Sequence, residues 1–305
     1  MAAYFWSSIS STDPTLGANW TKSDGTTGTT PGNGDDVYIQ AIAGLALASI
    51  GAADMSSVLL NSLTISRTFT GTIGTTATTG TFGYWKIGAA TWTIGTPSSD
   101  GTTAGGSGRI KIDFGSAAFV GTVTNVGTSI DSGLEPLRIK GTNGSNRLIV
   151  LGGRVGVATN LPGELSTINE VDASGSSAVV DFGAGVTWTT ATVAAGATLS
   201  TGSGSSGSLS VASGSTAITQ GSAAIATINA GGTVTLSHRP SSGAAVTTLN
   251  IYPTGTADFS QNPLGVTVTT LNQHSGGVLS FDPANPGQLT LGTHNLVNAG
   301  TLTAA

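Results

Sequence analysis

The stretch Thr227-Ile228-Asn229 recurs as Thr248-Leu249-Asn250 and again as Thr270-Leu271-Asn272, at almost constant spacing. Each copy is followed by a glycine-containing turn and a second apolar strand, as in Gly231-Gly232-Thr233-Val234-Thr235-Leu236. Self-similarity at a period of about 20–50 residues is typical of repeat architectures, and such a period suits one coil of a parallel β-helix. The three triplets therefore predict stacked coils whose short strands alternate inward apolar and outward small polar side chains.

Similar short strands extend this pattern toward the N-terminus. Ser210-Val211-Ala212 and Thr192-Val193-Ala194 precede the triplets at slightly shorter spacing. We align five earlier segments with them as one ladder: Leu63-Thr64-Ile65, Trp85-Lys86-Ile87, Ile110-Lys111-Ile112, Leu137-Arg138-Ile139 and Thr167-Ile168-Asn169. The spacing predicts a single-stranded parallel β-helix of roughly ten coils.

The composition supports an all-β chain. Charged residues make up 8% of the 305 residues, against ~25% in an ordinary domain. Equal charges stacked ~4.8 Å apart on neighbouring coils would repel, so a solenoid favours a low charge content. Three glutamates in the whole chain argue against a helical protein. Gly/Ser/Thr-rich disorder and an all-β sandwich remain the structural alternatives.

Composition also restricts the function. The absence of cysteine excludes a disulfide or zinc–cysteine scaffold. Ten Lys and Arg residues and a pI near 4.9 argue against nucleic-acid binding through a basic face. We expect no membrane span, because the longest apolar run, residues 41–50, is half the length that a transmembrane helix needs. The N-terminus lacks the basic and apolar regions of a signal peptide, which predicts folding in a cytoplasm.

The segment 1–60 differs from the rest of the chain. It carries the aromatic residues Tyr4, Phe5, Trp6 and Trp20, followed by a turn-rich segment. The first coil of a solenoid exposes an apolar end and an unpaired strand edge. We therefore predict a cap or attachment segment over residues 1–60, with the four aromatic residues as its candidate site, and a β-helix over 61–305.

Two short motifs favour structure over chemistry. Residues 202–207 match G-x-G-x-x-G but open no predicted helix, so they do not predict dinucleotide binding. Asp113-Phe114-Gly115 and Asp181-Phe182-Gly183 are separated by about three of the predicted coils, and the other parts of a kinase are missing. We interpret them as matching strand-to-turn positions of two coils.

Carboxylates are the candidates for catalysis, since β-helix lyases and glycosidases gather them on one face for acid–base work or calcium binding. The candidates here are Asp113, Asp131, Glu135, Glu164, Glu170, Asp172 and Asp181. Only Glu164, Glu170 and Asp172 fall within one coil, and the alternative for them is a set of solvated loop charges. We accordingly predict no catalytic, cofactor or metal site.

The basic residues give two weaker signals. The three histidines, His238, His274 and His294, lack metal-site spacing, although His274 and His294 could stack one coil apart. Four basic residues occur close together in the sequence: Arg138, Lys140, Arg147 and Arg154. They predict either a face for a polyanion or an acidic partner, or a solvated face of the solenoid.

The N-terminal segment resembles a pattern of Gly/Thr-rich β-solenoid proteins found in tailed-phage structural modules and, more distantly, in bacterial β-helix adhesins. The pattern runs from Tyr4-Phe5-Trp6 through Asn19-Trp20-Thr21 to Pro31-Gly32-Asn33-Gly34-Asp35-Asp36-Val37-Tyr38-Ile39. It ends there, and the remainder of the chain agrees only in style. Adhesins of this kind carry a secretion signal and an anchor, which this sequence does not show, so the resemblance favours the phage side.

The resemblance implies a non-enzymatic virion structural protein, assembled in the host cytoplasm. Within a virion we favour a head decoration or cement protein that forms a homotrimer and binds the major capsid protein, without cofactor, nucleic acid or membrane. One alternative is a tail fibre or tailspike that binds or cleaves cell-surface glycans. A second alternative is the passenger of a bacterial surface adhesin.

Overall fold

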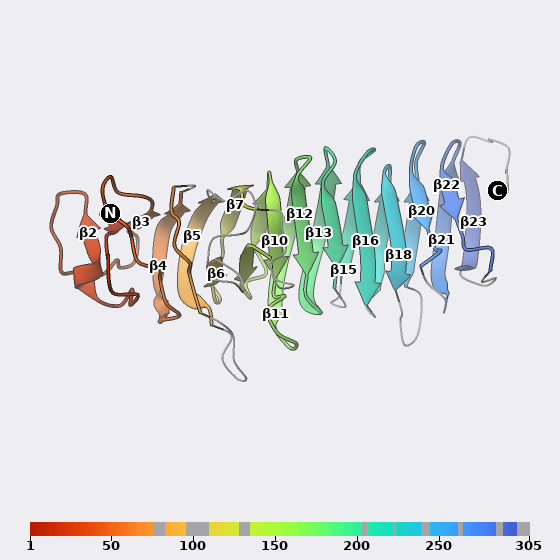
Figure 1. Ribbon diagram of the computed structural model, residues 1–305. Coiled ribbons are helices and arrows are strands. Elements are labelled where there is room, and N and C mark those ends of the chain that lie inside the picture. The colour runs from red at the N-terminus through yellow and green to blue at the C-terminus, as the bar shows by residue number, and fades with distance from the viewer. Residues whose placement is uncertain are drawn as a thin grey trace.

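The computed structural model describes residues 1–66, 68–75, 83–95, 110–127, 135–202, 206–221, 224–238, 245–261, 265–284 and 289–297. These residues form an elongated rod of stacked coils, with the red N-terminal coils at one end and residues 289–297, in blue, at the other (Figure 1). The described strands pair almost entirely in parallel, and the only described helix is a single 3₁₀ turn, Gly17–Asn19. The prediction of an all-β parallel β-helix is confirmed.

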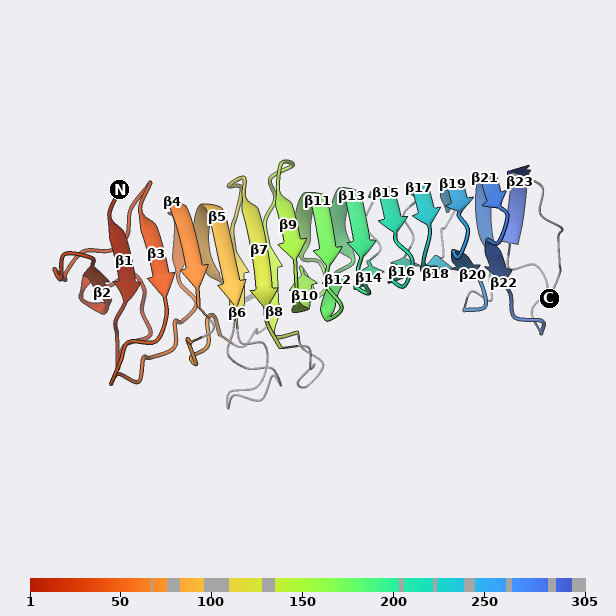
Figure 2. The ribbon, with the colours of Figure 1, turned by 90° about the horizontal axis from the view of Figure 1, so that it is seen from above.

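The strands form two ladders (Figure 2). The first runs the length of the rod, and the second begins at residue 110, beside Trp85 and Lys86. The first ladder comprises β1 (Ala3–Trp6), β3 (Asp36–Ile39), β4 (Asp54–Ile65), β5 (Trp85–Gly95), β7 (Val120–Asn125), β9 (Arg147–Val150), β11 (Leu165–Ser174), β13 (Gly185–Ala194), β15 (Ser206–Val211), β17 (Ile225–Ala230), β19 (Val246–Ile251), β21 (Val266–His274) and β23 (Leu289–Val297). The second comprises β6 (Ile110–Asp113), β8 (Leu137–Lys140), β10 (Gly153–Val157), β12 (Ala178–Phe182), β14 (Thr198–Thr201), β16 (Thr216–Gly221), β18 (Thr233–His238), β20 (Thr256–Asp258) and β22 (Val278–Ser280).

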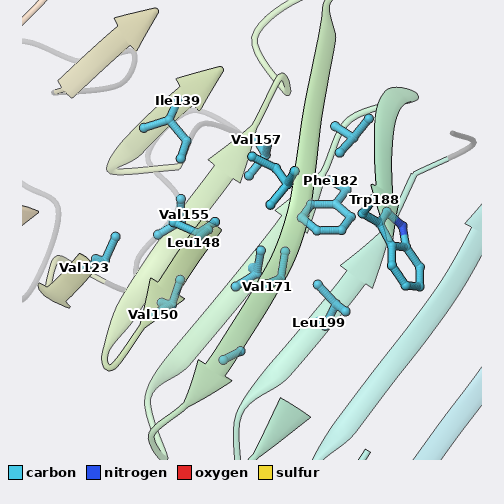
Figure 3. Packing of buried hydrophobic residues seen from close by; sticks show 14 of the residues in the cluster. Val123, Ile139, Leu148, Val150, Val155, Val157, Val171, Phe182, Trp188 and Leu199 are labelled. Atoms are coloured by element: carbon cyan, nitrogen blue, oxygen red, sulfur yellow. The ribbon is translucent and has the colours of Figure 1, made fainter. Parts of the chain in front are cut away.

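The core lies between the two ladders, where inward side chains of successive coils stack on one another. In the first ladder Leu209, Ile228, Leu249 and Leu271 occupy one register position, and all four are fully buried. Figure 3 shows the same packing around Val155, Val157 and Phe182, whose side chains meet between the strands. Because the inner face is apolar and the outer face polar, each coil depends on its neighbours for burial.

The three triplets, Thr-Ile-Asn and twice Thr-Leu-Asn, align as predicted. Thr227, Thr248 and Thr270 are register partners, and so are Asn229, Asn250 and Asn272. The earlier extension is out of register, because Leu209 rather than Val211 pairs with Ile228. Val211 instead stacks on Val193 and Ala230.

The single early ladder is also wrong. Ile65 and Ile168 belong to the first ladder, whereas Ile112 and Ile139 belong to the second. The coil that separates the register partners Leu63 and Trp92 is much longer than the one that separates Ala191 and Leu209. Coil length therefore varies along the rod, which defeats alignment by constant spacing.

The two Asp-Phe-Gly segments are only approximately equivalent. Both lie in the second ladder, three strands apart, as the interpretation of matching positions requires. However, Asp181 is in register with the position of Lys111 rather than with that of Asp113. The interpretation as matching positions is therefore right for the ladder and the number of coils, and wrong in the register.

The N-terminal segment continues the first ladder. Strand β1 pairs in parallel with β3, and β3 pairs in parallel with β4. The predicted boundary at residue 60 falls inside β4. A short strand, β2 (Trp20–Lys22), pairs antiparallel with β1 and closes that end of the sheet.

Candidate functional site

The aromatic residues of the N-terminal segment form the first coil's core. Trp6 and Trp20 are fully buried, with ring centroids 5.0 Å apart in an edge-to-face arrangement. Their indole N–H groups donate to the Ala48 and Pro14 carbonyl oxygens at 2.9 and 2.8 Å. Buried indoles that find such partners fix the surrounding loops, which is what a cap requires.

The other aromatic residues leave little room for an attachment surface. Tyr4 is buried and its hydroxyl lies 3.3 Å from the Thr29 hydroxyl. Phe5 is half-buried and stacks on Tyr38 at 5.3 Å. Of the four candidate residues, Phe5 alone reaches the surface appreciably, and the other three pack inside the first coil.

Several residues of the resembled pattern have structural roles. Asn19 is buried and donates to the Asp13 carbonyl oxygen at 2.6 Å and to the Ser11 hydroxyl at 3.0 Å. The Asp35 carboxylate accepts hydrogen bonds from the backbone N–H groups of Ala2 and Gly32 at 2.8 and 3.0 Å. These residues fold the first coil.

A second concentration of polar residues lies on the outer side of the second ladder. Lys111, Arg138, Gly156 and Asp181 are in register on β6, β8, β10 and β12. Their neighbours along each strand, such as Ile112, face the core, so this row points outward. Yet Lys111 and Arg138 are each only 1% exposed, because segments outside the strands cover them.

The covering segments supply the partners of this buried polar cluster, which we define as Tyr84, Lys111, Glu135, Arg138, Thr159, Asn160 and Glu164. Arg138 Nε donates to Glu135 Oε2 at 2.9 Å, and its Nη1 donates to Asn160 Oδ1 at 2.6 Å. Glu164 Oε2 accepts from the Tyr84 hydroxyl at 3.1 Å and from the Asn160 backbone at 3.0 Å. The Lys111 ammonium donates to the Thr75 carbonyl oxygen.

A glycine makes room for this arrangement. A Cβ atom at Gly156 would lie 2.2 Å from Thr159 Oγ1 and 2.7 Å from the carboxyl carbon of Glu135. Thr159 itself donates to Glu135 Oε2 at 3.0 Å. The missing side chain in the outward row is thus the space into which the Glu135 carboxylate fits.

Burial controls the electrostatics of the cluster. Desolvation, followed by the nearby Arg138 charge, lowers the pKa of Lys111 to about 8, against the opposing effect of Glu164. Desolvation and the Glu164 charge raise the pKa of Tyr84, which remains a hydrogen-bond donor at neutral pH. The two cations, Lys111 and Arg138, face two carboxylates, Glu135 and Glu164. One polar atom on each side, Arg138 Nη2 and Glu164 Oε1, has no hydrogen-bond partner among the described residues.

Glu164, Glu170 and Asp172 do not converge on one site. Glu164 belongs to the buried cluster, whereas Glu170 and Asp172 lie on the outer face of β11 beside Arg147. The distances from Arg147 Nε to Glu170 Oε2 and from Arg147 Nη2 to Asp172 Oδ2 are 3.3 and 3.6 Å. This partly exposed trio is an ion-pair network between neighbouring coils.

The remaining candidate carboxylates also pair with bases. Asp113 Oδ2 lies 3.1 Å from Lys140 Nζ, and Asp181 Oδ2 lies 2.6 Å from Arg154 Nε. Burial raises the pKa of Asp181, opposed by the hydrogen bond and charge of Arg154. Asp131 lies outside the described residues. Since Arg138, Lys140, Arg147 and Arg154 each contact a carboxylate, they do not form a free basic face.

The histidines do not stack one coil apart. His294 is in register with Leu271, and His274 with Val297. The His274 ring instead stacks on Tyr252 at 4.8 Å, and His238 ends strand β18. Among the residues that the structure describes, no group of three potential ligands could hold a metal ion.

Two further sequence predictions concern segments that are only partly described. The central residues of the 202–207 glycine motif, 203–205, lie outside the described residues, and its other residues belong to the β14–β15 region without a helix. Over the described parts of the chain, we find no helix long and apolar enough to cross a membrane.

Comparison with known proteins does not assign a family. No protein-family model, curated protein or solved structure matches the chain. What this chain does is therefore inferred from the geometry of the molecule and from the resemblance over positions 4–39.

The buried polar cluster is the feature of the structure that sequence reasoning missed, because its charges were interpreted as solvated. One signal could have revealed it. Lys111 and Arg138 occupy matching places in Ile110-Lys111-Ile112 and Leu137-Arg138-Ile139, and like charges on neighbouring strands need compensating carboxylates.

Proposed function

We propose that this chain is a non-enzymatic structural protein of a phage virion, a head decoration protein that forms a homotrimer and binds the major capsid protein. The proposal rests on the resemblance of residues 4–39 to phage β-solenoid proteins together with one structural observation. All thirteen described carboxylates, which are the 15 of the sequence without Asp100 and Asp131, contact another group of the chain.

That observation favours a structural role over catalysis. A glycoside-cleaving enzyme needs two carboxyl groups flanking the bond, with room for the sugar and for water between them. In this chain Glu135 and Glu164 are buried and bonded to Arg138, Tyr84 and the Asn160 backbone. Carboxylates such as Asp36, Asp113 and Asp181 join neighbouring coils, as the subunit of a rigid surface protein requires.

A glycan-binding tail fibre is the second candidate, and one observation favours it. Tyr252 is 40% exposed and stacks on His274 at the outside of the rod, and Val278 of the following coil is also exposed. Exposed aromatic rings with an apolar body and a polar tip suit interfaces that are partly apolar.

The discriminating experiment locates the protein on the virion. Empty heads are assembled from the major capsid protein encoded in the same genome, incubated with the pure chain, and sedimented. We expect co-sedimentation that saturates at a fixed number of copies per head. Immunogold labelling of the tail, with no binding to heads, would refute the decoration role and support the fibre.

A further inference from the structure

Asparagine is followed by glycine at two places in the chain, Asn33-Gly34 and Asn143-Gly144. Because glycine has no Cβ atom, its backbone nitrogen is open to the side chain of the preceding asparagine. Attack of that nitrogen on the side-chain amide is the first step of spontaneous deamidation, a covalent change that needs only water. The two sites have different surroundings in the fold, and these surroundings decide which of them reacts.

The first site, Asn33-Gly34, is bound to strand β4 through both its backbone and its side chain. The Gly34 N–H donates to the Leu59 carbonyl oxygen at 2.9 Å, and Asn33 Oδ1 accepts from the Leu59 N–H at 2.8 Å. The nitrogen that would attack therefore holds its proton in a hydrogen bond, and the side chain that it would attack is tied to the neighbouring strand. Reaction at this site requires that both bonds to Leu59 break first.

The second site, Asn143-Gly144, lies in the turn between β8 and β9. Gly144 and Ser145 are exposed, and the Gly144 N–H has no hydrogen-bond partner among the residues that the structure describes. The Ser145 N–H donates to Asn143 Oδ1 at 2.9 Å. This bond closes a ring that contains both Asn143 Cγ and the Gly144 nitrogen, so the side chain is folded back over the peptide that attacks it. The donor also lies where negative charge develops on Oδ1 during the attack.

We propose that Asn143 deamidates spontaneously in the folded protein, whereas Asn33 is protected. The Gly144 nitrogen gives up its proton and bonds to Asn143 Cγ, the bond from Cγ to Nδ2 breaks, and the side-chain nitrogen leaves as ammonia with that proton. Water then opens the resulting succinimide ring at either of its carbonyl groups, which leaves aspartate or isoaspartate at position 143. Each product adds one negative charge to the net charge of −5. This inference does not depend on the proposed function.

The reaction changes a contact between two coils. Asn143 Nδ2 donates to the Ser116 carbonyl oxygen, in the β6–β7 connection of the preceding coil, at 2.9 Å. A carboxylate has no proton to donate and places a negative oxygen toward that carbonyl oxygen instead. The Thr142 N–H also donates to this connection, to the Gly115 carbonyl oxygen at 2.7 Å. We expect deamidation to loosen the Thr142 bond, because the turn is then attached by fewer contacts.

Peptide mapping by mass spectrometry tests the inference on the full chain, aged at mildly alkaline pH in its folded state and, in parallel, in denaturant. Trypsin cleavage after Lys140 and Arg147 releases Asn143 in a short peptide, and fragmentation locates the converted residue. In the folded chain we expect Asn143 to deamidate at least about tenfold faster than Asn33, which reacts only when its two hydrogen bonds open. In denaturant the two sites should react at similar rates.

Two variants test the chemistry and its consequence separately. A Cβ atom at Gly144 would meet nothing within 4 Å, so Gly144→Ala keeps the turn while its methyl group hinders the attacking nitrogen. We expect this variant to slow deamidation of Asn143 at least about tenfold and to leave Asn33 unchanged. Asn143→Asp supplies one product directly, and backbone amide hydrogen exchange at Thr142 should be several-fold faster in it than in the wild type.

The results that would overturn the inference are equally specific. Equal rates at Asn143 and Asn33 in the folded chain, or reaction at Asn143 only in denaturant, would refute selective deamidation. Deamidation of Gly144→Ala as fast as that of the wild type would show that the Gly144 nitrogen is not the nucleophile. An unchanged exchange rate at Thr142 in Asn143→Asp would show that the reaction does not loosen the turn.

Discussion

Substitution of Gly121 tests how the core of the long N-terminal coils is packed. It faces the core from β7, in register with Trp92 of the preceding coil and Leu148 of the next. A Cβ atom at Gly121 would lie 1.9 Å from Trp92 Cζ2 and 2.0 Å from Cε2. The indole fills the space that a side chain at this position would occupy.

The indole has little freedom to move away. It stacks on Phe114 with centroids 5.1 Å apart and an interplanar angle of 3°, and it contacts Phe119 at 5.4 Å. Overpacking a rigid core by one methyl group costs about 1–3 kcal/mol. A glycine-to-alanine change with an ordinary φ angle recovers about 0.4–1 kcal/mol through the unfolded chain. We therefore expect Gly121→Ala to lower the free energy of unfolding by about 1–2 kcal/mol.

Guanidinium unfolding followed by tryptophan fluorescence measures this change against a matched control. A Cβ atom at Gly144, in the β8–β9 turn, would meet nothing within 4 Å, so Gly144→Ala should be neutral or stabilising by up to about 1 kcal/mol. Trp92→Phe removes the benzo ring that the new methyl group strikes, so the two changes together should be less damaging than their sum by at least about 0.5 kcal/mol. Equal stability of the two alanine variants, or strict additivity with Trp92→Phe, would refute the packing argument.

Three further predictions concern the polar interactions. Glu164→Gln should lower the free energy of unfolding by about 3 kcal/mol or more, because it leaves buried cations uncompensated. Glu170→Gln, in an exposed ion pair, should lower it by less than about 1 kcal/mol. Similar midpoints in thermal unfolding would contradict the assignment of Glu164 to a buried cluster. The Lys111 pKa of about 8 in the folded protein lies below its ordinary value of 10.5. Between these two pH values the unfolded chain binds more protons than the folded one. The free energy of unfolding of the wild type should therefore rise with pH across that window. Lys111→Met should abolish that part of the rise in unfolding experiments from pH 7 to 10.5, and an unchanged slope would show that Lys111 is not buried as described. Asn250→Ala removes the hydrogen bonds to Asn229 and Asn272 and should lower the free energy of unfolding by about 1–3 kcal/mol. Backbone amide hydrogen exchange should become faster in β17, β19 and β21. Unchanged exchange rates in these strands would mean that the hydrogen bonds between the asparagines do not stabilise the coils.

The sequence predicts the fold best where the coils are shortest and most uniform. Between Thr227 and Asn272 the coil length is nearly constant, and the register follows directly from the triplets. Toward the N-terminus the coils lengthen because connections of different length leave the strands. Constant spacing then places Ile112 and Ile65 in one ladder although they lie in two.

The candidate site was less predictable for a different reason. Strand alternation places Lys111 and Arg138 on the outside, which is correct, but alternation does not show which outward residues another segment covers. Their burial depends on Tyr84, Glu135 and Glu164, which lie outside the strands or at their ends. Contacts of this kind arise from the path of the connections, which sequence periodicity does not describe.

The charges of this solenoid also explain how its two halves differ. On the long N-terminal coils, residues of opposite charge lie side by side on neighbouring strands. Lys86 pairs with Asp54 in this way, and Lys140 pairs with Asp113. Each pair offsets the repulsion that stacking imposes on like charges, and the buried polar cluster does the same for Lys111 and Arg138. The C-terminal coils avoid the problem by carrying Thr, Ser and Asn, whose stacked groups bond to one another without regard to charge. A rod built in this way has one half in which ion pairs fix the connections and another in which hydrogen bonds between uncharged side chains join the coils.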